Sequence, residues 1–279
     1  MQERSPATCL FGDVRHFRQV DSTNRVAADL AREGAAEGLV VVADHQTAGR
    51  GRRGRSWHAQ PGSSLLASVV LRPRPDVAQS DLVMVACALA AADACGDAAG
   101  FVPDLKWPND LVVRGRKLAG LLAELVMDPR RVGPAVVVGL GLNVAWTGPG
   151  LASGAGGPLP DELAGRAVTA EAVAGRPVDR RTLLDAYLSR LERRWTDLAT
   201  GGTKALLEDY RCRCVTLGRP VRVDLPGGQV LEGVATGVDE DASLLVSSAG
   251  TETRVTAGDV VHLDGPSPWG DRSSASVPG

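Results

Sequence analysis

The sequence predicts an α+β protein with a larger domain that mixes helices and strands and a smaller all-β domain. Three observations support this. Apolar residues recur at helical spacing in three segments of the first two hundred residues, and short β-branched runs alternate with them. After Gly218 the chain changes to four or five short β segments in about fifty residues, which is typical of a small barrel. A length of 279 residues suits about two domains. We expect them to span residues 1–212 and 213–264.

The N-terminal part is expected to alternate helices with strands. Residues 21–24, Asp-Ser-Thr-Asn, offer capping side chains for a helix that Gly34 ends. Residues 39–43 form a β-branched run that predicts a buried strand, and residues 63–71 predict another. Ser80 is expected to cap a second helix, which is apolar on most sides and should therefore be buried.

Three strand segments and a long helix are expected in the second half of the larger domain. Residues 104–113 contain a proline and an Asn-Asp turn, and a tight turn at Gly115 leads into the strand 118–126. Residues 135–144 predict a further strand, whose glycines indicate a close approach by a neighbour. Residues 184–198 carry the apolar stripe of a long helix.

The composition restricts the possible functions. A formal net charge of −2 argues against a general nucleic-acid-binding surface. The chain does not open with a signal peptide, and no apolar run reaches about 18 residues, so we expect a cytoplasmic protein that does not contact membranes. The five cysteines lack the spacing of a zinc site and are expected to be reduced thiols. Residues 147–160 are expected to form a surface loop or insertion, and residues 265–279 a disordered tail.

The most informative segment is residues 49–57, Gly-Arg-Gly-Arg-Arg-Gly-Arg-Ser-Trp, which we call the arginine loop. Guanidinium groups bind carboxylate and phosphate oxygens in pairs, and glycine lets a backbone fold closely around a ligand. The letters also match the dinucleotide pattern G-x-G-x-x-G, but that pattern requires a following helix, and a strand is expected here. The alternatives are a solvated basic loop or a minor nucleic-acid contact. We favour a loop that is mobile when empty and closes over an anion.

The other candidate residues each have a plain structural explanation when taken alone. Lys106 and Asp110 could be ordinary charges at strand ends, and Lys117 a surface lysine. Ser22 and Thr23 could simply cap their helix. Trp107 is more often a core residue, Gln46 a solvated strand end, and Asn143 a turn residue.

Taken together and in chain order, these motifs resemble the biotin protein ligase family. The motifs are Asp-Ser-Thr-Asn at 21–24, Gln46 with the arginine loop, Lys-Trp-Pro-Asn-Asp at 106–110, Lys-Leu-Ala-Gly at 117–120 and Gly-Leu-Gly-Leu-Asn at 139–143. The resemblance covers about residues 10–263. It implies a mixed α/β catalytic domain related to class II aminoacyl-tRNA synthetases, followed by a small SH3-like barrel. Lipoate ligases share that fold but lack the arginine loop, so lipoate is the less expected acyl group.

The resemblance implies a two-step reaction. Biotin and ATP, with Mg²⁺, form biotinyl-5′-AMP and pyrophosphate, and biotin then passes to a lysine of a biotin carboxyl carrier domain of an acyl-CoA carboxylase. Biotin and ATP are substrates, and no tightly bound cofactor is expected. The first twenty residues are too few for the DNA-binding domain of some relatives, so we expect a monofunctional ligase that is a monomer or a homodimer. The alternative is a nucleic-acid-binding module, which the acidic residues Asp224, Glu232 and Asp239 in the predicted barrel disfavour.

The resemblance also implies roles for individual residues. Lys117 is the first choice for a catalytic residue, at the junction of carboxylate and phosphate, with Arg52 beside it. The expected biotin-binding residues are Ser22, Thr23, Gln46, Gly49, Arg50, Arg52, Trp57, Lys117 and Gly120. The expected ATP-binding residues are Arg53, Arg55, Lys106, Asn109, Asp110 and Asn143, and Asp110 is also the candidate Mg²⁺ ligand. No residue is assigned to stacking on adenine, and the role of the barrel stays open.

Overall fold

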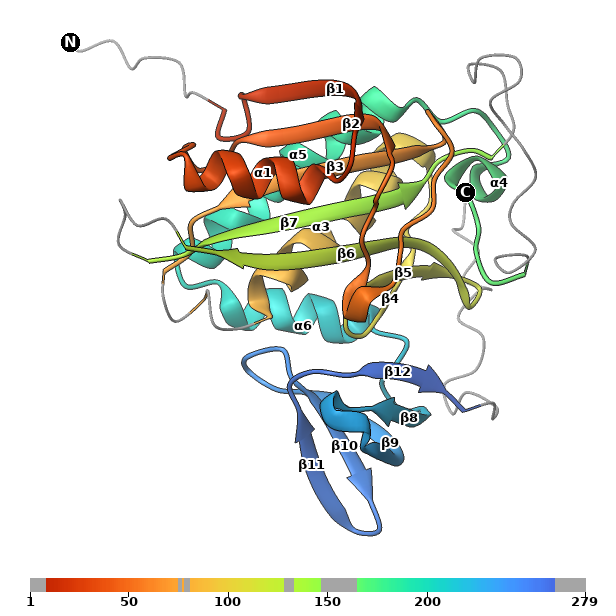
Figure 1. Ribbon diagram of the computed structural model, residues 1–279. Helices are drawn as coiled ribbons and strands as arrows, with labels where there is room; N and C mark the ends of the chain where they lie inside the picture. Colours follow the sequence, from red (N-terminus) through yellow and green to blue (C-terminus); the bar gives the residue numbers. More distant parts are fainter. Residues whose placement is uncertain (1–8, 75–76, 78–80, 128–132, 147–164, 264–279) are drawn as a thin grey trace, which may run out of the picture.

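The computed structural model describes residues 9–74, 77, 81–127, 133–146 and 165–263. Its centre is a seven-stranded sheet with the order β1-β2-β3-β7-β6-β5-β4 (Figure 1). Strands β1 and β2 are parallel, and the other neighbours are antiparallel. The strands are β1 (Val14–Val20), β2 (Val40–Gln46), β3 (Ser64–Leu71), β4 (Asp104–Lys106), β5 (Asp110–Val113), β6 (Arg116–Val126) and β7 (Ala135–Asn143). This sheet confirms the predicted α+β class and the predicted strands of the larger domain.

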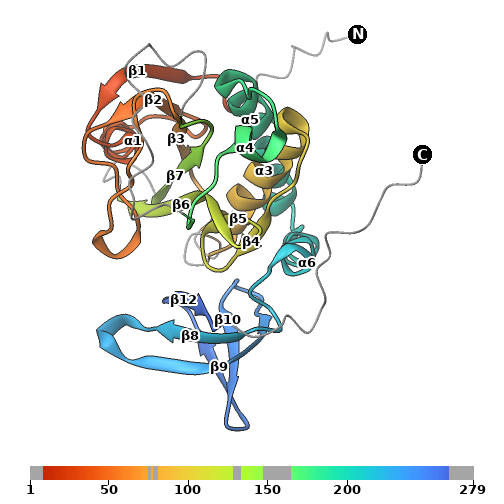
Figure 2. The same cartoon turned by 90° about the vertical axis from the view of Figure 1, so that its right-hand side faces the viewer.

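Helices cover both faces of the sheet, as Figures 1 and 2 show. Helix α1 (Thr23–Arg32) lies on one face, where its alanines pack on β2, β3 and β7. Helices α3 (Leu82–Ala99) and α5 (Arg180–Ala199) lie on the other face and pack mainly against each other. The short helix α4 (Ala170–Ala174) precedes α5. The predicted helices are thereby confirmed, although α1 receives no side-chain cap from Ser22.

Helix α3 is the central helix of the core. It is long and apolar enough to cross a membrane by length and composition alone, but most of its residues are buried against α5 and the sheet. Its first residue follows Asp81, and the predicted cap Ser80 lies outside the described residues. The predicted insertion at 147–160 and the predicted tail at 265–279 also lie outside them.

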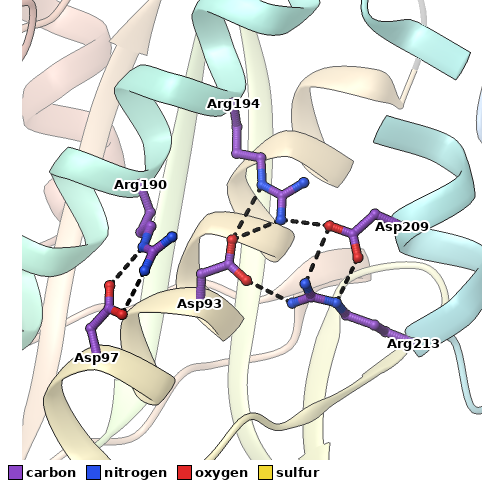
Figure 3. Close-up of polar contacts among 6 residues, drawn as sticks. All are labelled: Asp93, Asp97, Arg190, Arg194, Asp209 and Arg213. Atoms are coloured by element: carbon purple, nitrogen blue, oxygen red, sulfur yellow. Dashed lines mark hydrogen bonds and ion pairs between the residues drawn. The ribbon is translucent and has the colours of Figure 1, made fainter. Parts of the chain in front are cut away.

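Ion pairs join α3 and α5 to α6 (Thr203–Arg213), as Figure 3 shows. The carboxylate of Asp93 lies 2.7 Å from both Arg194 and Arg213, and Asp209 lies 2.5 Å from Arg194 and 2.7 Å from Arg213. Burial alone would raise the pKa of Asp93, but hydrogen bonds from the two arginines outweigh it and lower that pKa. Because every charge in the cluster has a partner, the desolvation cost of partial burial is offset and α6 is held in place.

Helix α6 leads into a second sheet with the order β11-β10-β9-β8-β12. Its strands are β8 (Pro220–Asp224), β9 (Val230–Val238), β10 (Leu244–Ser248), β11 (Thr251–Val255) and β12 (Asp259–His262). All neighbours are antiparallel, which confirms the predicted β-rich unit. Among the described strands no ladder joins β11 to β12, so the closure of the predicted barrel is not confirmed. The boundary between residues 212 and 213 stays a prediction.

The C-terminal sheet, β8 to β12, is fixed to the larger domain by hydrogen bonds from Trp107 and Asp81. The indole Nε1 of Trp107 donates to the carbonyl of Ala242 at 3.0 Å, and its backbone nitrogen donates to Thr216 Oγ1 at 3.1 Å. The backbone nitrogen of Asp81 donates to the carbonyl of Asp241 at 3.2 Å. Trp107 is 2% exposed, so it is a core residue that joins the two units.

His262 lies at this junction, and its environment predicts that the protein becomes less stable in acid. Burial, with Lys106 and Arg219 nearby, lowers the pKa of His262 from its usual 6.5 to about 4. The unfolded chain therefore binds a proton in a pH range where the folded chain does not. The free energy of unfolding should fall by at most about 3 kcal/mol from this group as pH drops from about 6.5 to about 4.

The variant His262→Gln should lose less stability over this pH range, because it has no group to protonate and can still bond Thr216. Denaturant unfolding of both proteins at several pH values between 7 and 4 measures the difference. Identical pH dependence in the two proteins would contradict the assignment.

Candidate functional site

A cavity with a volume of about 580 Å³ lies where the two sheets meet. The start of α1, the arginine loop, the β4–β6 region and β7 form its walls, and residues of β8 and β12 close it from the C-terminal side. In Figure 1 the arginine loop descends from between β2 and β3 past β6 to lie above β12. Two segments that are far apart in the sequence, the arginine loop and the C-terminal sheet, therefore enclose one site.

Trp57 forms one apolar wall of the cavity by packing on two glycines. Gly120 of β6 and Gly141 of β7 are direct partners in the sheet. A Cβ atom on Gly141 would lie 2.5 Å from Trp57 Cε2, and one on Gly120 would lie 3.3 Å from Trp57 Cζ3. The predicted close approach to the glycines of residues 135–144 is thus confirmed, with the indole of Trp57 as one of the approaching groups.

The start of α1 supplies a second, polar wall. Ser22, Thr23 and Asn24 line the cavity although each is at most 4% exposed. The backbone nitrogen and the hydroxyl of Thr23 both donate to Gln46 Oε1, at 2.7 and 2.9 Å. The Asn24 amide donates to Glu124 at 2.8 Å. This wall presents hydroxyl and amide groups that can hydrogen-bond a neutral polar ligand.

Positive charge dominates the cavity. Six cationic side chains and three carboxylates line it, a formal excess of three positive charges. The cations are Arg50, Arg52, Arg55, Lys106, Lys117 and Arg166, and the carboxylates are Asp110, Asp224 and Asp259. Burial, followed by the charges of Lys117, Arg219 and Arg55, lowers the pKa of Lys106, although Asp110 opposes this. A ligand with several negative charges would relieve the repulsion among these cations.

Lys117 lies close to both Asp110 and the indole of Trp57. Its Nζ lies 2.7 Å from Asp110 Oδ1 and 5.6 Å from the centre of the Trp57 ring. Its backbone is fixed by the segment at 166–168, because its nitrogen donates to the carbonyl of Arg166 and its carbonyl accepts from Val168. The ammonium group is therefore held at the point where the apolar wall and the charged part of the cavity meet.

The arginine loop is a short hairpin with a tight turn. The backbone nitrogen of Trp57 donates to the carbonyl of Gly49 at 2.9 Å, and that of Gly51 donates to Arg55 at 2.6 Å. The 3₁₀ turn η1 (Arg52–Gly54) lies between them, and Arg53 adopts φ +54°, in the left-handed region. That conformation costs an L-residue about 1–2 kcal/mol, so other contacts must stabilise it. The prediction that a strand and not a helix follows the loop is confirmed by β3.

The structure brings most of the predicted residues to one cavity. Those that line it are Ser22, Thr23, Gln46, Arg50, Arg52, Arg55, Trp57, Lys106, Asn109, Asp110, Lys117 and Gly120. Three predicted residues do not line it. Gly49 lies behind Trp57, Asn143 donates to the carbonyl of Val168 at 3.3 Å, and Arg53 turns to the C-terminal sheet. Asn109 lines the cavity, but its amide donates to the carbonyl of Leu121 at 2.7 Å and so holds its own turn.

Several lining residues were not predicted. Asn24 belongs to the motif at 21–24 but was interpreted as a cap, whereas its side chain faces the sheet. Arg166, Asp224 and Asp259 carry no local motif that would identify them. No group of three or more His, Cys, Asp or Glu residues in the part of the chain that the structure describes could hold a metal ion. Of the three carboxylates that line the cavity, Asp110 is the one that pairs with Lys117, at 2.7 Å.

Comparisons with known proteins give a consistent result. Residues 16–143 match the Biotin/lipoate A/B protein ligase family, and residues 216–263 match the Biotin protein ligase C terminal domain. The chain is 35% identical to a biotin–[acetyl-CoA-carboxylase] ligase of Mycobacterium tuberculosis over 94% of this chain and 96% of that protein. It is 32% identical to the enzyme of the same name from Paracoccus denitrificans, over 87% of this chain and 97% of that protein. The solved structure of an Aquifex aeolicus biotin protein ligase with biotin and ATP is similar, with TM-score 0.75, 25% identity, and coverage of 90% of this chain and 98% of that chain.

Proposed function

Because this chain belongs to the biotin protein ligase family, we propose that its cavity binds biotin and ATP side by side and that Lys117 and Arg52 act where they meet. The protein is an ATP-dependent biotin–protein ligase, which activates biotin as biotinyl-5′-AMP and transfers it to a carboxylase.

The two walls of the cavity suit the two ends of biotin. Thr23, Gln46 and the neighbouring Ser22 offer the hydrogen-bonding groups that the ureido ring requires. Trp57 on its two glycines offers a flat apolar surface for the rest of the molecule. The carboxylate of biotin then lies toward Lys117, next to the arginines.

The charge excess suits the first step of the reaction. An oxygen of the biotin carboxylate attacks the α-phosphorus of ATP, so that a new O–P bond forms. The bond from that phosphorus to the oxygen bridging to the β-phosphate breaks, and pyrophosphate leaves with the electron pair. Two anions must approach each other, so stabilisation by fixed cations lowers the barrier. Lys117 donates hydrogen bonds to the oxygens of the biotin carboxylate and of the α-phosphate where the two groups meet. Arg50 and Arg52 bind the carboxylate and the phosphate. Lys106 neutralises charge on the polyphosphate.

The second step requires an acceptor. We propose that the acceptor is a lysine of a biotin carboxyl carrier domain, whose amine attacks the biotin carbonyl carbon. A C–N bond forms, the bond from that carbon to the phosphate oxygen breaks, AMP leaves with the electron pair, and the amine nitrogen loses a proton to solvent. The mixed anhydride hydrolyses if water reaches it, so the arginine loop must cover it between the two steps.

Mg²⁺ would enter with ATP. Magnesium in such sites is held by one or two carboxylates together with substrate phosphates and water, and Asp110 is the carboxylate of this kind beside Lys106 and Lys117. Bound Mg²⁺ would supply further charge stabilisation on the polyphosphate.

We place the enzyme in the cytoplasm, since all five cysteines are free thiols.

The packing of Trp57 predicts a binding defect. In Gly141→Ala the new Cβ would lie 2.5 Å from Trp57 Cε2, so the indole must shift out of the biotin wall. Overpacking of this kind costs about 1–3 kcal/mol, so biotin affinity should fall about tenfold or more. Titration calorimetry with biotin measures the change. The control is Gly237→Ala in β9, where the nearest atom to a new Cβ is at 3.5 Å, and equal affinities in all three proteins would contradict the proposed wall.

The observation that carries the proposal is the excess of cations around Lys117 in a cavity that also has an apolar wall and a polar wall. The test is incubation of the protein with biotin, Mg-ATP and a biotin carboxyl carrier domain, followed by mass spectrometry of the carrier. We expect a mass increase of one biotin on a single lysine. Oligonucleotides should not stabilise the protein against heat, whereas biotin with Mg-ATP should.

A further inference from the structure

Two arginines of the arginine loop contact the C-terminal sheet. Arg53 donates from Nη1 to the carbonyl of Asp224 and from Nη2 to the carbonyl of Leu225, both at 2.8 Å. The carboxylate of Asp259 lies 2.5 Å from Arg55 and 3.4 Å from Arg53. One carboxylate on β12 therefore serves both arginines. Its side chain is 14% exposed, whereas that of Arg55 is 68% exposed.

These contacts explain the left-handed conformation of Arg53. The residue has φ +54° and does not line the cavity, although Arg52 before it and Arg55 after it both do. A left-handed residue is unfavourable unless its surroundings hold it. The two hydrogen bonds to backbone carbonyls and the ion pair with Asp259 hold the Arg53 side chain against the C-terminal sheet. Arg52 lines the cavity and forms no ion pair within 4.0 Å with any described residue, although its charge acts on the carboxyl of Asp81 and opposes the rise in pKa that burial causes there. A ligand can therefore still bind its guanidinium.

The C-terminal sheet can serve as a fixed support because it is anchored elsewhere. Trp107 and Asp81 bind the turn between β9 and β10 from the larger domain. Arg211 of α6 donates twice to the carbonyl of Val238, at 2.6 and 2.8 Å, and the ion pairs of Figure 3 hold α6 itself. Asp259 is thereby presented to the arginine loop at a defined position.

We propose that Asp259 is a positioning residue of the ligase reaction, which holds Arg53 and Arg55 so that Arg52 faces the substrates and the loop covers the intermediate. The inference rests on the proposed function, because the site must form a reactive adenylate for such cover to matter. It assigns a role to the C-terminal sheet, namely that of a template for the arginine loop. Arg53 in this account is a support of the loop and not an ATP ligand.

The ion pair between Asp259 and Arg55 also permits an opposite mechanism. The experiment must distinguish that mechanism from the positioning role. Asp259 could compete with the phosphates of ATP for Arg55 and so restrain the empty enzyme. Removal of its charge would then lower the KM for ATP. In the positioning mechanism removal of the charge loosens the loop, which raises the KM for ATP and lets biotinyl-5′-AMP escape.

The experiment compares Asp259→Asn with Asp259→Glu and with Glu252→Gln. Glu252 lies on β11, away from the larger domain in Figure 1, and its carboxylate accepts from Thr236. For Asp259→Asn we expect the KM for ATP to rise about fivefold to tenfold, the scale of a partly exposed charge-assisted hydrogen bond. The fraction of biotinyl-5′-AMP released into solution, measured by chromatography of radiolabelled nucleotide, should rise by a similar factor. Asp259→Glu should restore most of both values, and Glu252→Gln should match the unaltered protein.

Further measurements separate this inference from mere loss of folding and from failure of the proposed function. The unfolding temperature of each variant shows whether the sheet is intact. Arg53→Ala should reproduce the leakage, and the double variant Arg53→Ala/Asp259→Asn should leak no more than either single one. An unchanged or lower KM for ATP in a folded Asp259→Asn, or unchanged leakage, would overturn the positioning role. If the unaltered protein forms no biotinyl-5′-AMP, it is the proposed function that fails.

Discussion

Replacing Lys117 with alanine should slow the formation of biotinyl-5′-AMP by about 10²–10³-fold. The Nζ atom of Lys117 lies 2.7 Å from Asp110 and over Trp57, at the boundary between the apolar wall and the cations. A single preorganised donor to developing charge contributes on this scale, because its effect is greatest in the transition state. Release of pyrophosphate from Mg-ATP in the presence of biotin measures the rate in a single turnover.

Biotin affinity distinguishes a catalytic role from a binding role for Lys117. We expect the Kd for biotin to change much less than the adenylation rate, because the hydrogen bonds of Thr23 and Gln46 and the Trp57 wall are retained. Lys204→Ala, an exposed lysine on α6, is the matched control and should behave as the unaltered protein. Near-normal pyrophosphate release by Lys117→Ala would refute the assignment.

Replacing Arg52 with alanine should make the enzyme release its intermediate. Arg52 lines the cavity without an ion pair to any described residue, and we assign it to the carboxylate and phosphate of the substrates. Without this guanidinium the loop loses a charge-assisted contact to the adenylate, which lowers the affinity by a factor of about 10–100. Free biotinyl-5′-AMP acylates exposed lysines of any protein nearby.

Labelling of a bystander protein such as serum albumin measures this leakage. It should rise about tenfold or more with Arg52→Ala, while labelling of the carrier domain falls. Arg181→Ala, an exposed arginine at the start of α5, is the control for loss of positive charge. A background equal to that of the unaltered protein would show that Arg52 does not retain the intermediate.

Local patterns in the sequence predicted those features that depend on residues close together along the chain. The β-branched runs became β2, β3 and β7, and the apolar stripe of residues 184–198 lies within α5. The arginine loop and the motif at 106–110 converge on one cavity, as the resemblance implied. The alternation of Gly139 and Gly141 in a strand indicated a close neighbour, because glycine weakens a strand unless space is needed. The structure identifies those neighbours as Asn24 and Trp57.

Contacts between distant segments could not be predicted in this way. Arg53 and Asp259 are 206 positions apart, and each is an ordinary charged residue in its own surroundings. The sequence favours Asn24 as a helix cap, because such residues are common at the start of a helix, but the sheet beneath α1 offers its amide better partners in Leu122 and Glu124. The resemblance implies that Arg53 orders the loop and contacts ATP, but a motif does not indicate the direction of each side chain, and here Arg53 donates to the carbonyls of Asp224 and Leu225.

A crystal structure with a stable analogue of biotinyl-5′-AMP would show directly whether Lys117 and the arginine loop act on the intermediate. We expect the phosphate of the analogue to contact Lys117 Nζ and the guanidinium of Arg52, with the biotin ring against Trp57 and the arginine loop closed above it. A phosphate bound elsewhere, or an arginine loop directed into solvent with the analogue in place, would contradict it.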